Sequence, residues 1–461
     1  TMVPKRRCKS VAHPVVARKN PKRECNIFSD VESIQQVEEK IAKPAPKPSQ
    51  VTSTTELVDN TNEVSTDATG VLSVVSFNSS TNNGESDTDD QLWEEVHLYN
   101  DGNFELPTGD QLSRILCHVN TSAAGEVQVL KKITQWAETE NAEFLTLFHR
   151  KFGVVNVINF LKMVLNDNTN IVGASLLFSN IEWASRAIES VCYNGGEDKV
   201  IYDIAKKITT TAIEFDGMDM LTSVSKKCTC SVNASKHVAK RRNDSVLLSK
   251  QRALAAVWAT LANMSELIST HDTSERRVTN EAVNKVLNAG VDVIIQITPV
   301  ETYRNMEIRM NALHTLKELV VRGYVEREHI EKYDVVFKIV GFFQNRIEKV
   351  ESKVSETALE MAIRLFSWCH MKDLLDGNDF HRLLPLCISS LKQYAQSNMK
   401  IRERAVDLIH GACLTMTDST MIEEAGAMEV LGEMLAMNAV GQCEKDCIRS
   451  VIVHMFGKLN S

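Results

Sequence analysis

Apolar residues recur at three- and four-residue intervals from about residue 91 to the C-terminus, which is the spacing of amphipathic helices. Val127, Leu130 and Ile133, for example, fall on one face of a helix. Five of the nine prolines lie in the first 46 residues, so the rest of the chain is nearly free of helix breakers. The pattern predicts an almost unbroken series of helices and no β-sheet.

Two segments of this region closely resemble each other. Residues 288–297 and 424–433 both place Ala-Gly before an apolar helix, and each is followed by a short polar stretch and a second amphipathic helix. Gly290 and Gly426 are 136 residues apart. That distance corresponds to three steps of roughly 45 residues, a period typical of helical-repeat proteins.

Further copies occupy the expected positions between and before these two. They begin at 152–161, at 215–221 with a partner helix at 251–261, at 333–340 with 355–365, and at 380–386 with 401–409. The units resemble armadillo repeats, in which a glycine, an apolar helix and a longer helix of the Ala-x-x-Ala-Leu-x-x-Leu kind follow one another. The resemblance covers residues 153–459. It implies an all-α, right-handed solenoid of armadillo-like repeats, with glycines at the sharp turns and apolar faces buried by stacking.

The first 90 residues have a different composition. Residues 1–25 carry eight basic residues against Glu24, a net charge of +7, and residues 26–100 carry a net charge of −11. Few apolar residues are clustered here, so the segment cannot offset the entropy of ordering. We expect a disordered arm at 1–90, basic at 1–25 and acidic or polar at 26–90, before a repeat domain at 91–461. Ser86 and Thr88 lie among carboxylates, where an acid-directed kinase would act.

Two basic clusters suggest contacts with acidic partners. The first has the form of a bipartite nuclear localisation signal and consists of Lys5, Arg6, Arg7, Arg18, Lys19, Lys22 and Arg23. The second lies in a segment, 223–247, that lengthens its repeat and is predicted to be an inserted surface loop. Its basic residues are Lys226, Lys227, Lys236, Lys240, Arg241 and Arg242. A nuclear or nucleic-acid-associated factor acting through clusters 5–23 and 226–242 is therefore an alternative function.

Signatures of catalysis and of bound cofactors are absent from the sequence. No phosphate-binding loop, dinucleotide fingerprint, zinc-protease helix or nucleophile elbow occurs. Cys228, Cys230 and His237 form the one metal-like grouping, and they lack a fourth ligand. The sequence predicts a protein that is not an enzyme and has no cofactor and no metal.

The compartment is predicted from the cysteines and the hydropathy. Eleven cysteines with irregular spacing, together with a basic and polar start at residues 1–25, favour free thiols in a reducing compartment. No apolar run approaches the ~20 residues of a membrane-spanning helix. We expect an intracellular protein, cytoplasmic, nuclear or both, without a membrane contact.

The armadillo resemblance implies a scaffold or adaptor that binds an extended protein segment along a concave groove. Candidate contacts on the second helices of the repeats are Trp258, Asn263, Arg304, Asn305, Asn311, His314, Arg402 and Arg404. A cargo binder similar to the nuclear import adaptors is a further alternative. That family repeats a Trp and an Asn four positions later, whereas Asn263 follows Trp258 by five positions.

Overall fold

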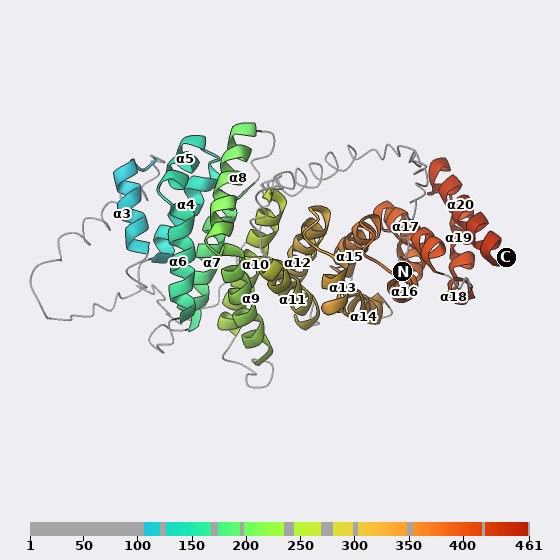
Figure 1. Cartoon of the computed structure of the whole chain (residues 1–461). Coiled ribbons are helices and arrows are strands. Elements are labelled where there is room, and N and C mark those ends of the chain that lie inside the picture. The colour runs from blue at the N-terminus through green and yellow to red at the C-terminus, as the bar shows by residue number, and fades with distance from the viewer. Residues whose placement is uncertain are drawn as a thin grey trace, which may run out of the picture. The chain divides into compact units, whose positions relative to one another are not determined.

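The computed structural model confirms an all-α architecture. It describes residues 106–119, 126–166, 174–193, 198–234, 244–268, 280–297, 303–347, 354–416 and 420–459. These residues form eighteen helices and contain no strand (Figure 1). All of them belong to one compact unit, Asn82–Ser461. The arm predicted at 1–90, its basic cluster at 5–23, Ser86 and Thr88 lie outside the described residues.

The helices follow one another along the chain and are labelled as in Figure 1. They are α3 (Gly109–Val119), α4 (Glu126–Glu138), α5 (Ala142–Arg150), α6 (Gly153–Asn166), α7 (Ala174–Val191), α8 (Lys199–Glu214), α9 (Gly217–Ala234), α10 (Asp244–Leu267), α11 (Asn280–Gln296), α12 (Tyr303–Val321), α13 (Arg327–Lys332), α14 (Val335–Ile347), α15 (Val354–Met371), α16 (Gly377–Tyr394), α17 (Met399–Thr415), α18 (Thr420–Glu424), α19 (Ala427–Ala436) and α20 (Gln442–Leu459). The segments predicted at 251–261, 355–365, 380–386 and 401–409 lie within α10, α15, α16 and α17. Those at 152–161, 215–221, 288–297, 333–340 and 424–433 overlap α6, α9, α11, α14 and α19 but extend past a helix end.

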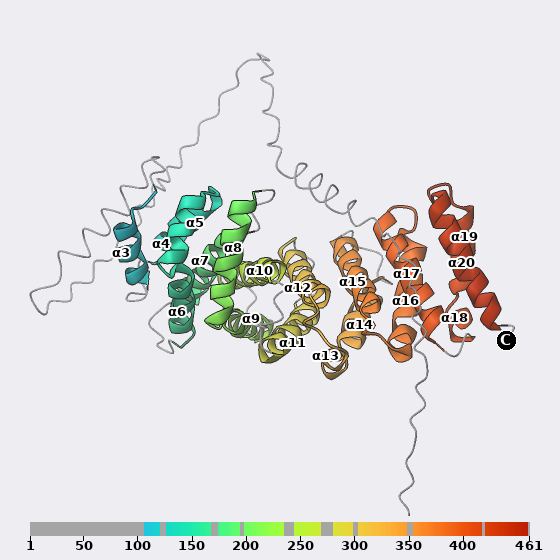
Figure 2. The same cartoon turned by 45° about the horizontal axis from the view of Figure 1, so that its top comes forward.

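The packing of the helices forms two rows, which establishes the repeat. One row, here called the second-helix row, runs α3, α6, α9, α11, α14, α16, α19, and each helix packs on the next. The other is here called the third-helix row and contains the longer, second helices of the repeats predicted from the sequence. It runs α4, α7, α10, α12, α15, α17, α20 with the same neighbour-to-neighbour packing. In both views α10, α12, α15 and α17 lie along one edge and α9, α11, α14 and α16 along the other (Figures 1 and 2). The chain is therefore a helical-repeat solenoid.

Apolar side chains fill the space between the rows. A single connected core runs through the described residues, from Leu112 on α3 to Met455 on α20, and is mainly Leu, Ile, Val and Ala. Small and aliphatic side chains let helices approach closely, and each repeat buries a face that it could not bury alone. No helix within the described ranges has the length and apolar character needed to cross a membrane.

Several helix starts are fixed by side chains that accept hydrogen bonds from free backbone N–H groups. The carboxylate of Asp198 accepts from the N–H groups of Val200 and Ile201 at the start of α8. Asn141 and Asn398 cap α5 and α17 in the same way. Each cap satisfies donors that the helix itself leaves unpaired.

The glycines expected at the turns behave differently from one another. Gly426 has a φ of 80°, in the left-handed region, and turns the chain between α18 and α19 as expected. Gly290 lies inside α11, so its predicted role in a turn is wrong. A Cβ at Gly290 would lie 3.0 Å from Leu316 Cδ2 and 3.3 Å from Trp258 Cη2. A residue without a side chain fits at position 290 because side chains of α10 and α12 pack closely against α11.

The inserted loop predicted at 223–247 is largely wrong. Residues up to Ala234 continue α9, and α10 begins at Asp244, which leaves 235–243 between them and outside the described residues. The run from Met218 through Leu221, Val224 and Cys228 keeps a buried apolar face. This periodicity extends the helix through a segment that was predicted to be a loop because it lengthens its repeat.

Candidate functional site

The third-helix row has an outward side that its neighbours leave open, here called the third-helix face. It is defined by Lys131 on α4, Trp183 and Glu189 on α7, Asn263 and Glu266 on α10, and Asn311 and His314 on α12. All seven side chains are half-buried. The face is therefore polar with an aromatic member, in contrast with the aliphatic core.

Contacts between successive helices join these side chains into one surface. The Lys131 ammonium lies 5.2 Å from the ring centroid of Trp183, and the Arg186 guanidinium lies 5.7 Å from it. The amide of Asn263 is 3.4 Å from the backbone oxygen of Glu189. Because a cation over an aromatic face is attracted by the ring quadrupole, the Trp183 side chain is held in place between α4 and α7.

Glu189 is the most perturbed carboxyl group on this face. Burial, opposed by Arg186 and assisted by the carboxylates of Glu307 and Glu138, raises its pKa from 4.5 to about 7. Glu138 ends α4 and Glu307 lies on α12, so carboxylates from three helices of the row influence one another. A carboxyl group with this pKa changes its charge near neutral pH.

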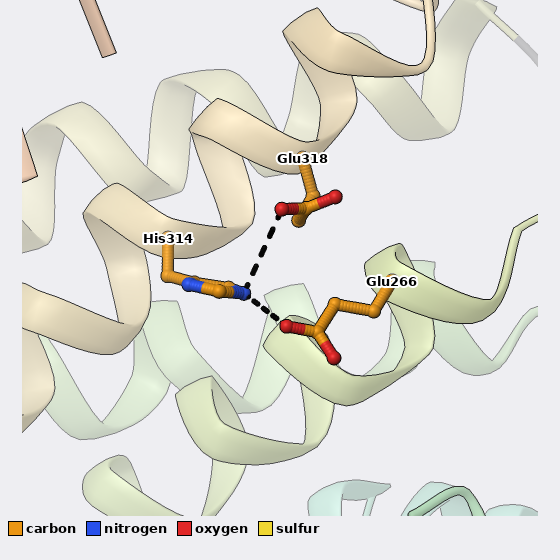
Figure 3. Close-up of side chains that lie close together, drawn as sticks. All are labelled: Glu266, His314 and Glu318. Carbon is orange, nitrogen blue, oxygen red and sulfur yellow. Dashed lines mark hydrogen bonds and ion pairs between the residues drawn. The ribbon is translucent and has the colours of Figure 1, made fainter. Parts of the chain in front are cut away.

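A second polar cluster joins α10 to α12 (Figure 3). His314 Nε2 lies 2.5 Å from Glu266 Oε1 and 3.9 Å from Glu318 Oε1. Lys317 Nζ is 2.6 Å from Glu318 Oε1, and Arg322 donates to the backbone oxygen of Glu266 at 2.5 Å. In the part of the chain that the structure describes, this is the one group of three His, Cys, Asp or Glu residues whose ligand atoms lie within 4.8 Å of one another.

Three of the eight predicted contact residues are buried, so their prediction as partner contacts is wrong. Trp258 has no exposed surface, and its Nε1 donates to Ser225 Oγ at 3.0 Å. Asn305 is 1% exposed and accepts a hydrogen bond from the Gln251 amide. Both positions face neighbouring helices. The sequence alone does not show which side of α10 or α12 packs against them.

Arg402 is the third buried residue, and its contacts are structural. It donates to the backbone oxygens of Ala395 at 2.6 Å and Ala439 at 3.3 Å. It also forms a two-pronged ion pair with the Glu444 carboxylate, in which Nη2 lies 3.0 Å from Oε2 and Nε contacts Oε1. These bonds tie α17 to the end of α16 and to α20, and Arg402 is 3% exposed.

The other five predicted contacts remain accessible. Asn263, Asn311 and His314 belong to the third-helix face and are brought together on adjacent helices. Arg304 and Arg404 are half-buried on α12 and α17. Their role in binding stays a prediction. Glu266 and Glu189 could not be predicted from the sequence, because only the register between repeats places them beside these residues.

Only part of the second basic cluster is described. Lys226 is exposed on α9, and Lys227 donates to the backbone oxygen of Leu165 at 2.9 Å, which anchors α9 to α6. Lys236, Lys240, Arg241 and Arg242 lie outside the described residues. Binding of nucleic acid through this cluster therefore stays a prediction.

Four buried thiols show no sign of activation. Burial raises the pKa of Cys192, Cys228, Cys369 and Cys387 to about 12 in each case. A thiol with such a pKa stays protonated at neutral pH and is a poor nucleophile and a poor metal ligand. Cys228 packs within α9, while the side chain of Cys230 and all of His237 lie outside the described residues.

Two surface cavities occur away from the third-helix face. One of about 470 Å³ is lined by His149 on α5 and by Lys206, Lys207 and Thr210 on α8, among others. Another of about 430 Å³ lies between α9 and α11. Asp203 and Glu214 also line the first cavity, so its lysines face charges of both signs.

Comparisons with known proteins add little to this geometry. No family model matches the chain, and no curated protein matches it. Two similar solved structures are of engineered proteins. The first is 12% identical with a TM-score of 0.39, and the match covers 66% of this chain and 97% of the engineered chain. The second is 11% identical with a TM-score of 0.28, and the match covers 80% of this chain and 91% of the engineered chain.

A third similar structure comes from a study of a phosphorylation switch that controls the interaction between cadherin and β-catenin. It is 11% identical with a TM-score of 0.29 and covers 82% of this chain and 89% of its own. Likeness at these identities and scores says nothing about function. The packing of the two helix rows therefore carries the assignment, and the chain is an all-α helical-repeat protein.

Proposed function

We propose that this protein is a non-catalytic scaffold of the armadillo type that binds an extended protein segment along its third-helix face. The observation that carries the proposal is the continuous surface made by Trp183, Asn263, Asn311 and His314 on three successive third helices. Polar groups on a rigid helical row suit recognition of a peptide backbone, and a half-buried tryptophan on such a surface is a frequent centre of binding energy.

The helix pattern within the repeats supports the armadillo assignment. A short helix, α13, precedes the longer pair α14 and α15, and α18 precedes α19 and α20 in the same way. α5 and α8 occupy the same place before their pairs. A short first helix followed by two longer ones distinguishes the armadillo unit from simple two-helix repeats.

The dimensions of the row favour an extended partner. Packed helices lie about 8–10 Å apart, and an extended chain advances about 3.3 Å per residue. A segment lying across the row would therefore place about three residues against each third helix. Because the helices are fixed by their core packing, binding would require little reorganisation of the scaffold.

The experiment is selection of peptides from a random extended-peptide library on the full-length chain, followed by affinity measurement with purified peptides. Trp183→Ala and Asn311→Ala should each weaken binding, and loss of the tryptophan should cost at least about tenfold. Phe337→Ala is the matched control, because Phe337 is 58% exposed on α14 in the second-helix row.

Circular dichroism and thermal unfolding of each variant separate loss of binding from loss of structure. The proposal is wrong if no library member binds, or if the selected peptides bind the Trp183 and Asn311 variants as tightly as the unaltered chain. It is also wrong if Phe337→Ala weakens binding to the same extent, since that would place the partner on the opposite row.

A further inference from the structure

The cluster that joins α10 to α12 has the donor atoms of a metal site. His314 and Glu318 are one helical turn apart on α12, and Glu266 lies in the last turn of α10, with all three side chains directed to a common point (Figure 3). We propose that this cluster binds one divalent transition-metal ion of the zinc class, through His314 Nε2 and one oxygen each of Glu266 and Glu318. The inference does not depend on the peptide-binding proposal.

The distances suit such an ion after small side-chain movements. Zinc lies about 2.0–2.2 Å from nitrogen and oxygen ligands, which puts tetrahedral ligands about 3.3–3.5 Å apart. The separations of 2.5 Å and 3.9 Å from His314 Nε2 to the two carboxylates lie on either side of this value. Glu266 would move away from the imidazole by about 1 Å, and the helices themselves would stay in place.

The site remains open to a further ligand. The side chains of His314, Glu266 and Glu318 are 24%, 32% and 10% exposed, so the cluster is neither sealed nor fully solvated. Zinc sites with three protein ligands keep their fourth position for water or another donor. In this cluster that position would face the solvent side of the third-helix row.

The positively charged side chains of Arg322 and Lys317 lie beside the proposed metal position, and their contacts must allow a cation to bind there. Arg322 donates to the backbone oxygens of Glu266 at 2.5 Å and Ile268 at 3.4 Å, so its charge lies against the negative C-terminal end of α10. Lys317 contacts Glu318 Oε1, and Arg322 Nε lies 3.6 Å from Glu318 Oε2. A metal at Oε1 would displace the Lys317 ammonium, whereas Arg322 would keep its contact with Oε2. A carboxylate ligand that is also hydrogen-bonded by a second residue is the usual arrangement around protein metals.

The ligand types predict which ions bind. One imidazole and two carboxylates favour zinc over manganese in the general order of divalent affinities. Magnesium and calcium prefer sites made entirely of oxygen, so they should bind weakly or not at all.

The test is equilibrium dialysis of the full-length chain against ZnCl₂, with accessible thiols alkylated beforehand so that cysteines do not compete. We expect one zinc ion per chain. Glu266→Gln and His314→Ala should each weaken binding by at least about tenfold, the scale seen when groups of a metal site are removed. Glu266→Gln keeps the shape and hydrogen-bonding capacity of the side chain, so folding should be retained, and circular dichroism verifies this.

His454→Ala is the control for a competing histidine site. The rings of His410 and His454 lie 5.9 Å apart, and this pair is the obvious alternative zinc ligand set among the described residues. Retention of zinc binding in His454→Ala supports the proposed site. Absence of zinc binding to the unaltered chain, full binding by Glu266→Gln, or loss of binding in His454→Ala would each overturn the proposal.

Discussion

Replacement of Glu189 by glutamine should stabilise α7 at alkaline pH. Burial, opposed by Arg186 and assisted by the carboxylates of Glu307 and Glu138, raises the pKa of Glu189 from 4.5 to about 7. The folded protein therefore binds a proton that the unfolded chain releases between these two pH values. For such a carboxyl group, stability is highest below pH 4.5 and falls as pH rises to about 7.

The size of the effect follows from the shift. A difference of about 2.5 pKa units corresponds to about 3 kcal/mol at 1.36 kcal/mol per unit, and this is an upper bound because relaxation and water penetration reduce it. Glutamine keeps the shape of the side chain and cannot ionise. We therefore expect a gain of about 1–3 kcal/mol at about pH 8 and almost none below pH 4.5.

The measurement should be local, because solenoids need not unfold in one step. Hydrogen exchange of the α7 amides, corrected for the intrinsic pH dependence of exchange, gives the free energy of local opening at each pH. Glu433→Gln, an exposed carboxylate on α19, is the matched control. If α7 shows the same pH profile in Glu189→Gln as in the unaltered chain, Glu189 does not titrate near neutrality and the reasoning is wrong.

Three further variants test the packing of the repeats, each measured by the free energy of local opening from hydrogen exchange of the helices concerned. Arg402→Met should lower this free energy for α17 and α20 by about 3–5 kcal/mol, since it leaves the half-buried Glu444 carboxylate and two carbonyls unpaired, and unchanged exchange would contradict this. Gly290→Ala should cost about 1–3 kcal/mol by overpacking against Leu316, whereas a stabilised variant would show that the helices separate freely. Asp198→Ala should cost about 1 kcal/mol through loss of the α8 cap, and Asp198→Asn should restore it.

The repeat and the helix order could be predicted from the sequence because stacking requires a regular apolar period. The segments 355–365 and 401–409 lie within α15 and α17, where the apolar spacing predicts the helix. The role of Gly290 could not be predicted, because the pattern that places a glycine before an apolar run is the same for a turn and for a close helix contact. Only the distance from Gly290 to Trp258 and Leu316 distinguishes the two.

The surface was predicted less well than the core, for a related physical reason. Trp258 and Trp183 both lie on third helices within apolar runs, yet Trp258 is buried and Trp183 is half-exposed beside Lys131. A one-residue change of register rotates a side chain by 100° around an α-helix, which is enough to move it from the core to the surface. The register is set by contacts between repeats, and those contacts come from residues distant in the sequence.

The same dependence explains why the polar clusters were found only in the structure. His314 and Glu318 have the four-residue spacing of a shared helical face, which the sequence displays. Glu266 is 48 residues away from His314, and it joins them only because α10 and α12 are neighbours in the third-helix row. In a solenoid, residues separated by about one repeat length lie on adjacent helices of the same row and can therefore contact each other. A binding surface of such a chain should be sought among polar residues that recur at this spacing, and not among single conspicuous residues.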